Sequence, residues 1–380
     1  MSKELPEDLI IDILSRVPTR SILRFKSVSK SWYSLFENPN FISKHIQNQS
    51  TISDQSFLTK YPVSTISGPT VGLILCDSSY KSIKIPIDIN ISNPASVSGS
   101  CNGLICLSFL PLGWVILLWN PATMVFKDLP ISTIDRPQHD RPTHVMLGFG
   151  FDDVVKDYKV LRIIHYGFMS KQVEIFSLST NSWREINPGF DDFLTPMSAC
   201  RVFLNGNLHW PAFDSRGLDD ARVIVCFDFH EEVFHYIMPP KFEFTGCIKD
   251  ARWKVVAMKE LLAVIGWLRV ESMMLFEVWV MKEYGVVSSW TKYTSFEIQN
   301  RKVKPLGCGL KGEFLMEKDN GQLFVYDSDS QRVIKSLGND QLYSFSDVFN
   351  HVGSLVPIVG GKVATKTNLS SVVRDPFFVR

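Results

Sequence analysis

One glycine-rich segment has the spacing of a cofactor-binding loop. Residues 307–312 read Gly-Cys-Gly-Leu-Lys-Gly and match the fingerprint that presents helix N-terminal amides to a dinucleotide pyrophosphate. The residues that follow, 313–316, lead into a Gly-Gln turn and another predicted strand, whereas the fingerprint requires a helix. We therefore predict no nucleotide or other cofactor.

A second segment imitates the turn that carries a catalytic nucleophile. Residues 99–103 read Gly-Ser-Cys-Asn-Gly, which would place Cys101 at the tip of a strand-to-helix elbow. The residues after it, 104–107, are strand-like, so the required helix is missing. We expect Cys101 to be a buried turn residue and predict no catalytic residue here.

Histidines and acidic pairs give no better candidate. Two histidine pairs have members five residues apart, a spacing that matches no familiar metal-ligand pair and puts the partners on opposite strand faces; they are His139 with His144, and His230 with His235. Two acidic pairs could supply general acid and base catalysis, although acids in turns are more commonly solvated; they are Asp152-Asp153 and Asp191-Asp192. We predict no metal site and a non-catalytic protein, with a propeller-fold hydrolase or lyase as the alternative.

The N-terminal segment has the pattern of short amphipathic helices. Pro6 stands where a first helical turn needs no N–H group, and the first helix must end near Val17 because the residue before Pro18 is disfavoured in the α region. Thr19 or Ser21 is expected to cap a second helix, which a third helix follows. The apolar positions are Leu9, Ile10, Ile13, Leu14 and Val17, then Ile22, Leu23, Phe25 and Val28, then Trp32, Leu35 and Phe36.

Three helices this short cannot bury all of that apolar surface among themselves. Chains below about 40 residues rarely make an adequate core alone and usually complete it with a partner. The segment is therefore expected to pack on another surface. That surface would belong to a second protein or, in the simpler alternative, to the rest of this chain.

The segment resembles the F-box in three phrases, at 5–9 (Leu-Pro-Glu-Asp-Leu), 13–18 (Ile-Leu-Ser-Arg-Val-Pro) and 22–32, which ends in Lys-Ser-Trp. Ser29 departs from the pattern, because many members of that family have cysteine there. The resemblance implies docking on a Skp-family adaptor, which links the F-box to a cullin and RING ubiquitin ligase. The residues it places on the adaptor, the last four shared with the small helical core, are Leu5, Pro6, Leu9, Ile13, Leu14, Val17, Pro18, Leu23, Phe25, Val28 and Trp32.

A helix-turn-helix that reads DNA is the sharper alternative for the same segment. Its second half is basic, as phosphate contacts require, but nearby acids largely offset that charge. The whole chain has 40 Lys and Arg against 39 Asp and Glu, a formal charge of +1. We therefore predict no nucleic-acid partner. The basic residues are Arg16, Arg20, Arg24, Lys26 and Lys30, and the acids are Glu4, Glu7, Asp8 and Asp12.

Composition indicates a folded intracellular protein. The 380 residues are 45% hydrophobic and 12% aromatic, enough for one large core or two domains. No apolar run approaches the roughly 18 residues of a membrane span, and the N-terminus lacks the basic-then-apolar pattern of a secretory signal. The 7 cysteines are scattered and suit buried thiols. We expect a cytoplasmic or nuclear protein without membrane contact.

Beyond about residue 70, one hairpin shape recurs. An aromatic residue is followed by a turn and by another apolar residue seven positions later, as at 119–126, 176–183 and 227–234, while 326–333 repeats the spacing. Trp279 with Trp290 is interpreted as the same hairpin with an insertion, and Cys76 with Ile83 as a degraded first copy. The copies start 43 to 57 residues apart, near the roughly 50-residue period of kelch-like propeller blades. We predict an all-β propeller of six blades, with a β-sandwich as the alternative.

The same region resembles the plant F-box-associated interaction domain, which follows the F-box in a family that includes the S-locus F-box proteins. The resemblance extends from about 95 to 357 and rests on an ordered series of phrases. They are Gly-Ser-Cys-Asn-Gly-Leu at 99–104, Trp-Asn-Pro-Ala-Thr at 119–123, Gly-Phe-Gly-Phe-Asp at 148–152, Asp-Tyr-Lys-Val at 157–160, Asn-Gly-Asn-Leu-His-Trp at 205–210 and Ser-Trp-Thr-Lys at 289–292. Most of these residues are expected to be scaffold.

These patterns predict four segments: an F-box at 1–48, a linker at 49–70, a propeller-like domain at 71–360 and a C-terminal tail at 361–380. The resemblance implies the substrate-recognition subunit of an SCF-type (Skp–cullin–F-box) ubiquitin ligase, whose β domain holds a protein target for ubiquitination and proteasomal degradation. Loops at one rim would recognise that target. The candidate loops are 132–143, 187–197 with Phe190 and Phe193, 213–220 and 281–288.

Overall fold

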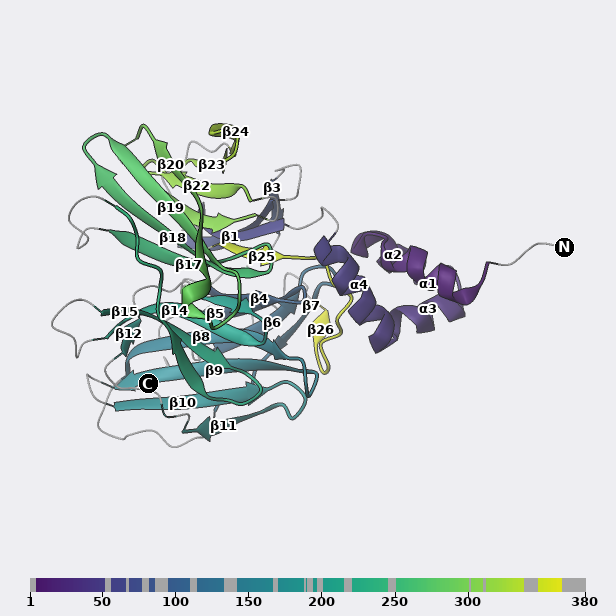
Figure 1. The fold of residues 1–380 in the computed structure, drawn as a ribbon. Helices are drawn as coiled ribbons and strands as arrows, with labels where there is room; N and C mark the ends of the chain where they lie inside the picture. Colours follow the sequence, from purple (N-terminus) through teal and green to yellow (C-terminus); the bar gives the residue numbers. More distant parts are fainter. Residues whose placement is uncertain are drawn as a thin grey trace.

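A small helical segment projects from one end of a ring of β-sheets (Figure 1). This predicted fold class is confirmed. The computed structural model describes residues 5–51, 56–65, 68–76, 82–85, 95–109, 115–132, 142–166, 170–187, 189, 194–196, 201–214, 221–244, 251–300, 302–309, 312–337 and 348–363. Within these residues no helix is both long enough and apolar enough to cross a membrane.

Four helices make up the N-terminal segment, one more than the sequence predicts. Ser29 caps α3, because its hydroxyl accepts a hydrogen bond from the Trp32 amide at 3.1 Å. The predicted cap of α2 by Thr19 or Ser21 is wrong, since Pro18 occupies the N-cap and no side chain bonds there. The helices are α1 (Glu7–Ser15), α2 (Thr19–Phe25), α3 (Lys30–Glu37) and α4 (Pro39–Thr51).

The additional helix, α4, fastens the end of α1. His45 is fully buried, and its Nε2 lies 2.9 Å from the carbonyl oxygen of Val17, to which Gln49 also donates at 3.3 Å. Burial lowers the pKa of His45. The sequence signal for α4 was weak because the helix is polar apart from a narrow stripe. Pro39 at its first position and the spacing of Phe41, Ile42 and His45 could have revealed it.

The described strands form six antiparallel sheets. Their orders are β25-β1-β2-β3, β4-β5-β6-β7 with β26 outside β7, β8-β9-β10-β11, β14-β15-β16 with β12 and β13 both on β14, β17-β18-β19-β20, and β21-β22-β23-β24. The first strands are β1 (Ser56–Thr65), β2 (Gly68–Cys76), β3 (Ser82–Ile85), β4 (Ala95–Cys101), β5 (Leu104–Phe109), β6 (Val115–Asn120), β7 (Val125–Asp128), β8 (Pro142–Asp152), β9 (Asp157–Tyr166), β10 (Ser170–Ser177), β11 (Ser182–Ile186), β12 (Leu194–Pro196) and β13 (Val202–Leu204). The later strands are β14 (Asn207–Asp214), β15 (Ala221–Asp228), β16 (Phe234–Ile237), β17 (Arg252–Met258), β18 (Leu261–Val270), β19 (Met273–Met281), β20 (Trp290–Ile298) after the 3₁₀ turn η2 (Val287–Ser289), β21 (Val303–Cys308), β22 (Phe314–Lys318), β23 (Leu323–Asp327), β24 (Arg332–Leu337), β25 (Val348–His351) and β26 (Lys362–Val363).

Both ends of the β region close the ring. The innermost strands contact one another in the order β25, β4, β8, β13 with β14, β17 and β21, and β21 in turn contacts β25. Strand β25, near the end of the chain, completes the sheet of β1 to β3, and β26, which follows it, pairs with the outer strand β7 of the next sheet. A sheet shared by both ends of a chain holds the ring shut, because opening it would break the pairing of β1 with β25.

Strand β1 lies within residues 49–70, which the sequence analysis assigns to a linker. It pairs with β2 along its length and with β25 through Ser56 to Thr59. Pro62 weakens the local strand signal, and β25 is supplied by a segment almost 300 residues away. A strand that depends on so remote a partner leaves little trace in its own sequence.

The repeated hairpin is the connection between the third and fourth strands of a blade. Trp119 pairs with Phe126, Phe176 with Trp183, Phe227 with Phe234, and Tyr326 with Val333. Trp279 and Trp290 also lie on the third and fourth strands of one blade, but Trp290 is opposite Met281, two residues after Trp279. Ile83 lies opposite Leu75, one residue before Cys76.

Each of the four regular hairpins has the same turn. The residue after the aromatic accepts hydrogen bonds from turn amides, as Asn120 does from Ala122 and Thr123. Asp228 does the same for His230 and Glu231. The residue four positions after this accepting residue has a positive φ in every copy. These residues are Met124, Asn181, Glu232 and Gln331.

Candidate protein-binding surfaces

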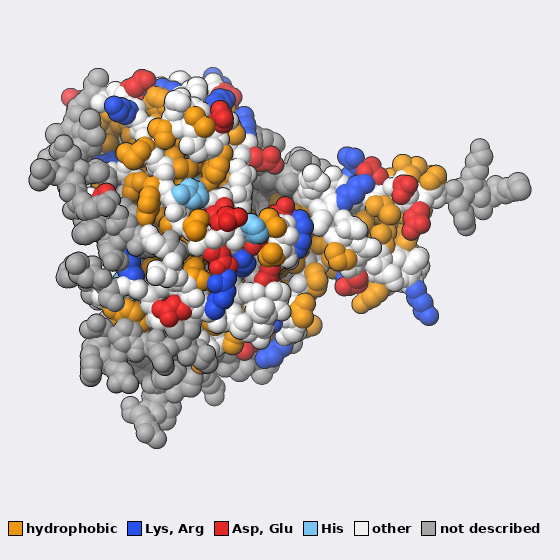
Figure 2. Space-filling model, turned by 60° about the horizontal axis from the view of Figure 1, so that its bottom comes forward, with side chains coloured by type: hydrophobic (Ala, Val, Ile, Leu, Met, Phe, Trp, Pro, Cys, Tyr) orange, Lys and Arg blue, Asp and Glu red, His pale blue; other side chains and the backbone are white. Residues whose placement is uncertain are grey.

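The tip of the helical segment has an exposed apolar face. On α1 and just before it, Leu5 is 56% exposed, Leu9 45% and Ile13 49%. Val28, after α2, and Tyr33, on α3, are also exposed, at 62% and 53%. Figure 2 shows hydrophobic side chains gathered on the projecting helices, away from the ring. Isolated exposed apolar residues are ordinary, but several on so small a segment indicate an interaction site. We call Leu5, Leu9, Ile13 and Val28 the apolar tip.

Other predicted adaptor residues face the interior to different degrees. Leu14 is only 5% exposed and belongs to the helical core, together with Ile22 and Phe36. Val17, Leu23, Phe25 and Trp32 are half-buried against that core, whereas Pro6 and Pro18 are exposed. The docking of all eleven residues on an adaptor stays a prediction. Tyr33 on α3, which the sequence did not point to, is also exposed.

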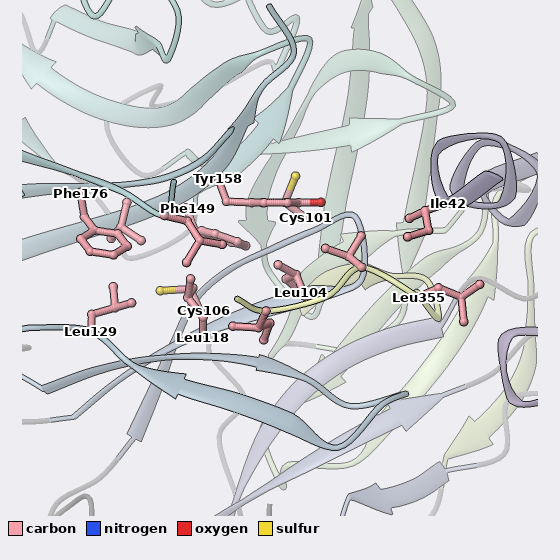
Figure 3. Packing of buried hydrophobic residues seen from close by; sticks show 14 of the residues in the cluster. Ile42, Cys101, Leu104, Cys106, Leu118, Leu129, Phe149, Tyr158, Phe176 and Leu355 are labelled. Carbon is pink, nitrogen blue, oxygen red and sulfur yellow. The ribbon is translucent and has the colours of Figure 1, made fainter. Parts of the chain in front are cut away.

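The core of the helices is continuous with the core of the propeller. One cluster of buried side chains runs from Leu14, Ile22 and Ile42 into the blade of β4 to β7 (Figure 3). Leu355 lies in the same cluster, on the connection between β25 and β26. The helices therefore have a packed base on the ring, opposite to their exposed tip.

That connection, residues 352–358, is held between the helices and the blades, and we call it the strap. Asn120 is fully buried, and its side-chain amide donates to the carbonyl oxygens of Ser354 and Val356 at 3.1 and 2.9 Å. Thr19 packs on the strap at Gly353, where an added Cβ would lie 2.8 Å from the threonine hydroxyl. The Trp-Asn-Pro-Ala-Thr phrase thus both forms a turn and binds the strap, a second role that sequence reasoning did not find.

Gly103 lies against the strap, so the energetic weight of this contact can be tested by comparing Gly103 with a similar glycine that has no such neighbour. Asn102-Gly103 and Asn205-Gly206 form the same kind of turn, with φ of +77° at Gly103 and +75° at Gly206. A Cβ at Gly103 would lie 2.2 Å from the Cβ of Ser354, whereas one at Gly206 meets nothing within 4 Å. Gly103→Ala is therefore expected to cost about 2 kcal/mol more stability than Gly206→Ala, because both strain the backbone but only one displaces the strap.

Chemical denaturation of the two variants measures that difference. Increased hydrogen exchange at 352–358 in Gly103→Ala, with none in Gly206→Ala, would locate the effect in the strap. Equal losses of stability would show that the strap contact has no energetic weight.

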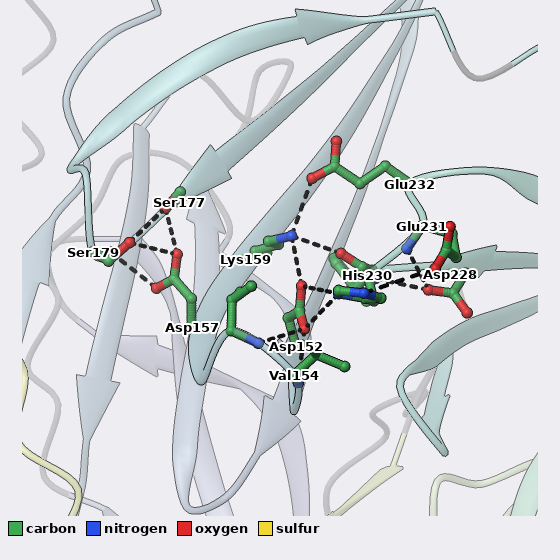
Figure 4. A network of polar contacts seen from close by, with 12 residues as sticks. Asp152, Val154, Asp157, Lys159, Ser177, Ser179, Asp228, His230, Glu231 and Glu232 are labelled. Atoms are coloured by element: carbon green, nitrogen blue, oxygen red, sulfur yellow. Dashed lines mark hydrogen bonds and ion pairs between the residues drawn. The ribbon is translucent and has the colours of Figure 1, made fainter.

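The two acids at 152–153 have different structural roles, and Figure 4 shows the contacts of Asp152. Asp152 is buried, bonds the Lys159 ammonium at 2.8 Å and accepts the amides of Val154 and Val155. Burial favours its neutral form, but the Lys159 and backbone hydrogen bonds outweigh it and hold the pKa below the usual value. Asp153 is exposed and pairs with Lys156. The Asp191-Asp192 pair lies outside the described residues.

The other chemical motifs are also structural where they are described. Cys101 is buried in a strand end, and burial raises the pKa of its thiol, which disfavours the reactive thiolate. In the 307–312 segment, β21 is followed by a return to β22, and no helix begins at those of its residues that the structure describes. Among the described residues no three His, Cys, Asp or Glu side chains converge as a metal site.

The candidate recognition loops can be assigned to the two rims of the propeller. Inner strand β25 ends beside the helices, because Gly353, just after it, contacts Thr19 of α2. The inner strands of a propeller run in the same direction, so all of them end at the rim that carries the helices. They start at the opposite rim, which we call the distal rim. Strands β7, β11 and β15 border the candidate loops 132–143, 187–197 and 213–220 at this distal rim. Most of these loops lie outside the described residues, as do Phe190 and Phe193, so their target contacts stay predictions.

The fourth candidate loop, 281–288, has the other orientation. It joins β19 to β20 and so belongs to the rim that carries the helices. Tyr284 of this loop places its hydroxyl 2.7 Å from Nε2 of the fully buried His209. Burial lowers the pKa of His209 to about 4, so the ring is neutral at physiological pH. This bond anchors the loop to the neighbouring blade.

Comparisons with known proteins agree with this two-part architecture. Residues 3–44 match the F-box domain, and residues 56–360 match the F-box associated beta propeller domain. The second match begins at β1 and includes most of the segment predicted as a linker.

Similar curated proteins span the same two parts. The F-box protein CPR1 of Arabidopsis thaliana is 28% identical over 356 residues, covering 87% of this chain and 83% of that protein. An F-box/kelch-repeat protein of the same plant is 28% identical over 312 residues, covering 80% and 82%. The propeller, the helical tip and these matches together show that the chain belongs to the family of F-box proteins with an F-box associated β-propeller domain.

Proposed function

We propose that this protein is the substrate receptor of an SCF-type ubiquitin ligase. The apolar tip would dock a Skp-family adaptor, and through it the cullin and RING subunits. The combination of an F-box with a substrate-binding propeller is typical of such receptors. F-box proteins are in general receptor subunits, and the protein would make and break no bonds itself.

The single observation that carries this proposal is the exposure of the apolar tip. Leu5, Leu9 and Ile13 are about half exposed, although the rest of the helical core is sealed by α4 and the strap. Burying each such side chain in an interface contributes about 1.5–3 kcal/mol when it is complete. The tip therefore offers the binding energy that a stable adaptor complex needs. It also disfavours the inert cap, in which the chain's own body would cover this surface.

The packed joint between helices and propeller gives the receptor its mechanical role. Thr19, Ile42 and the strap fix the tip at one end of the ring, while the distal rim faces away. A target held at that rim would stay at a set distance from a ubiquitin-charged enzyme on the cullin. Such tethering replaces a dilute encounter with a high effective concentration of the target lysine.

Co-purification of the full chain with a plant Skp-family adaptor tests the proposal. The expected result is a stoichiometric complex that survives gel filtration and then recruits a cullin with its RING subunit. If the folded chain captures no member of the adaptor family, the proposal is wrong. A salt-sensitive complex with duplex DNA in place of the adaptor would favour the regulator alternative.

A further inference from the structure

A pocket opens at the distal rim between the sheets β17–β20 and β21–β24. Its volume is about 570 Å³, and it is lined by the starts of β17, β19 and β21 together with the ends of β18 and β22. All of these strand ends face away from the helices. The pocket therefore lies at the end of the propeller opposite to the proposed adaptor site.

Cations dominate the lining of this pocket. Five basic side chains surround it against two acidic ones, Glu317 and Asp319. Glu317 is buried and already bonds Lys304 at 2.7 Å. The basic residues are Arg252, Arg269, Lys302, Lys304 and Lys318.

Two of these cations have no counter-ion among the described residues. The guanidinium groups of Arg252 and Arg269 make no hydrogen bond or ion pair within the described part of the chain, and both residues are exposed. Lys302 lies 3.9 Å from the exposed Asp319, at the limit of an ion pair. The pocket thus keeps an excess of positive charge that its own acids do not neutralise.

Apolar side chains share the sheet face that carries the two arginines. Arg252 lies directly opposite Trp267 in the register of β17 and β18, and Arg269 lies opposite Met274 in that of β18 and β19. Directly opposite residues project from the same face of a sheet. Each guanidinium fork therefore stands beside a large apolar surface, Trp267 for one and Met274 for the other.

We propose that this pocket binds an acidic segment of the protein target. Carboxylates of the segment would pair with the Arg252 and Arg269 guanidinium groups, which suit two-pronged recognition. An apolar side chain between those carboxylates would lie on Trp267. The inference rests on the proposed receptor function and adds to it the place and chemistry of target recognition.

A polypeptide fits this pocket better than a nucleic acid. Glu317 and Asp319 would repel a dense row of phosphates, whereas carboxylates spaced along a peptide can avoid them. The chain as a whole has a formal charge of only +1, so it lacks the broad positive field that attracts nucleic acid.

Fluorescence anisotropy on the full chain tests the pocket without the adaptor. The probe is a labelled peptide of alternating glutamate and leucine, compared with a lysine–leucine peptide and a single-stranded oligonucleotide. We expect the acidic peptide alone to bind, with an affinity that falls as salt is added. The double variant Arg252→Glu, Arg269→Glu should weaken it roughly a hundred-fold, about ten-fold for each charge-assisted contact.

Matched variants keep the result specific to the pocket. Arg332→Glu makes the same charge change at an exposed position on the outer strand β24 and should leave binding unchanged. Arg269→Lys keeps the charge but loses the fork, so an intermediate loss is expected. Circular dichroism and adaptor capture should match wild type in every variant.

The outcomes separate this inference from the proposed function. No binding of the acidic peptide, equal binding by the double variant, or preference for the oligonucleotide would each overturn the pocket assignment. Any of these results with adaptor capture intact leaves the receptor proposal standing. Acidic-peptide binding by a chain that captures no adaptor would support the pocket and contradict the receptor.

Discussion

Replacing Leu9 and Ile13 together with aspartate is expected to abolish adaptor binding while the protein stays folded. Both side chains are about half exposed, so the helical core does not depend on them. In a complex they would be buried. The double change removes two apolar contacts and forces unpaired carboxylates into an apolar interface. We expect a loss of about 4 kcal/mol or more, a roughly thousand-fold weaker complex.

Isothermal titration with the purified adaptor measures this loss. Ser43→Asp is the matched control, because it adds a carboxylate at an exposed position of α4, which contributes no predicted adaptor contact. Leu14→Asp should also abolish binding, but by disrupting the helical core in which Leu14 is buried, and circular dichroism would show the difference. Wild-type affinity in the Leu9 and Ile13 double variant would exclude the apolar tip as the docking site.

Lys159→Met is expected to cause a large loss of propeller stability. The lysine is almost fully buried and bonds Asp152, Glu232 and the carbonyl oxygen of Phe229, at 2.8, 3.0 and 2.7 Å. It thereby joins the blade of β8–β11 to the blade of β14–β16. Removing one partner of a buried ion pair leaves an uncompensated charge and costs about 3–5 kcal/mol.

Lys156→Met makes the same change three residues away and is the control. Its ion pair with Asp153 is exposed, so a change within about 0.5 kcal/mol in the free energy of unfolding is expected in urea.

The contribution of the Lys159 network to stability should also depend on pH. The pKa of Asp152 is lower in the folded protein than its unfolded value of 3.8, so the stability that its carboxylate contributes is present above pH 3.8 and is lost as the pH falls through the folded pKa. The advantage of wild type over Lys159→Met should fade in that acidic range. A deficit for Lys159→Met no larger than that of the control would refute the structural role.

The propeller could be predicted because its blades repeat a local pattern. Trp119 and Phe126, or Phe227 and Phe234, are cross-strand partners separated by a short turn, so their spacing is visible in the sequence. The positive φ at Met124, Glu232 and Gln331 could not be predicted, since these residue types do not favour it. There the hairpin geometry and the preceding Asx-type hydrogen bonds impose the conformation.

Features that depend on remote partners were missed. Strand β1 needs β25, and the strap needs Asn120, which lies more than 230 residues before it. In the Trp279 hairpin, whose insertion was recognised, the exact partners were not predicted, because a longer loop with its own 3₁₀ turn, anchored by Tyr284, places Trp290 opposite Met281. No local rule predicts contacts of this kind.

The apolar tip could be predicted from local sequence, whereas the distal pocket could not. The apolar tip is local, since Leu9 and Ile13 follow a helical period, and the surplus of apolar surface in α1 to α3 could be predicted. The distal pocket collects Arg252 from β17, Arg269 from β18 and Lys302 from the segment just before β21, and only the ring brings them together. From the sequence we predicted that the aromatic residues Phe190 and Phe193 bind the target. The described residues instead form a basic pocket between two other blades.

Hydrogen–deuterium exchange of the full chain with and without the Skp-family adaptor tests the central claim most directly. The account predicts strong new protection of α1 to α3, centred on Leu9 and Ile13, and unchanged exchange at the strands that line the distal pocket. Protection of the propeller with none at the helical tip, or no protection anywhere at saturating adaptor, would contradict it.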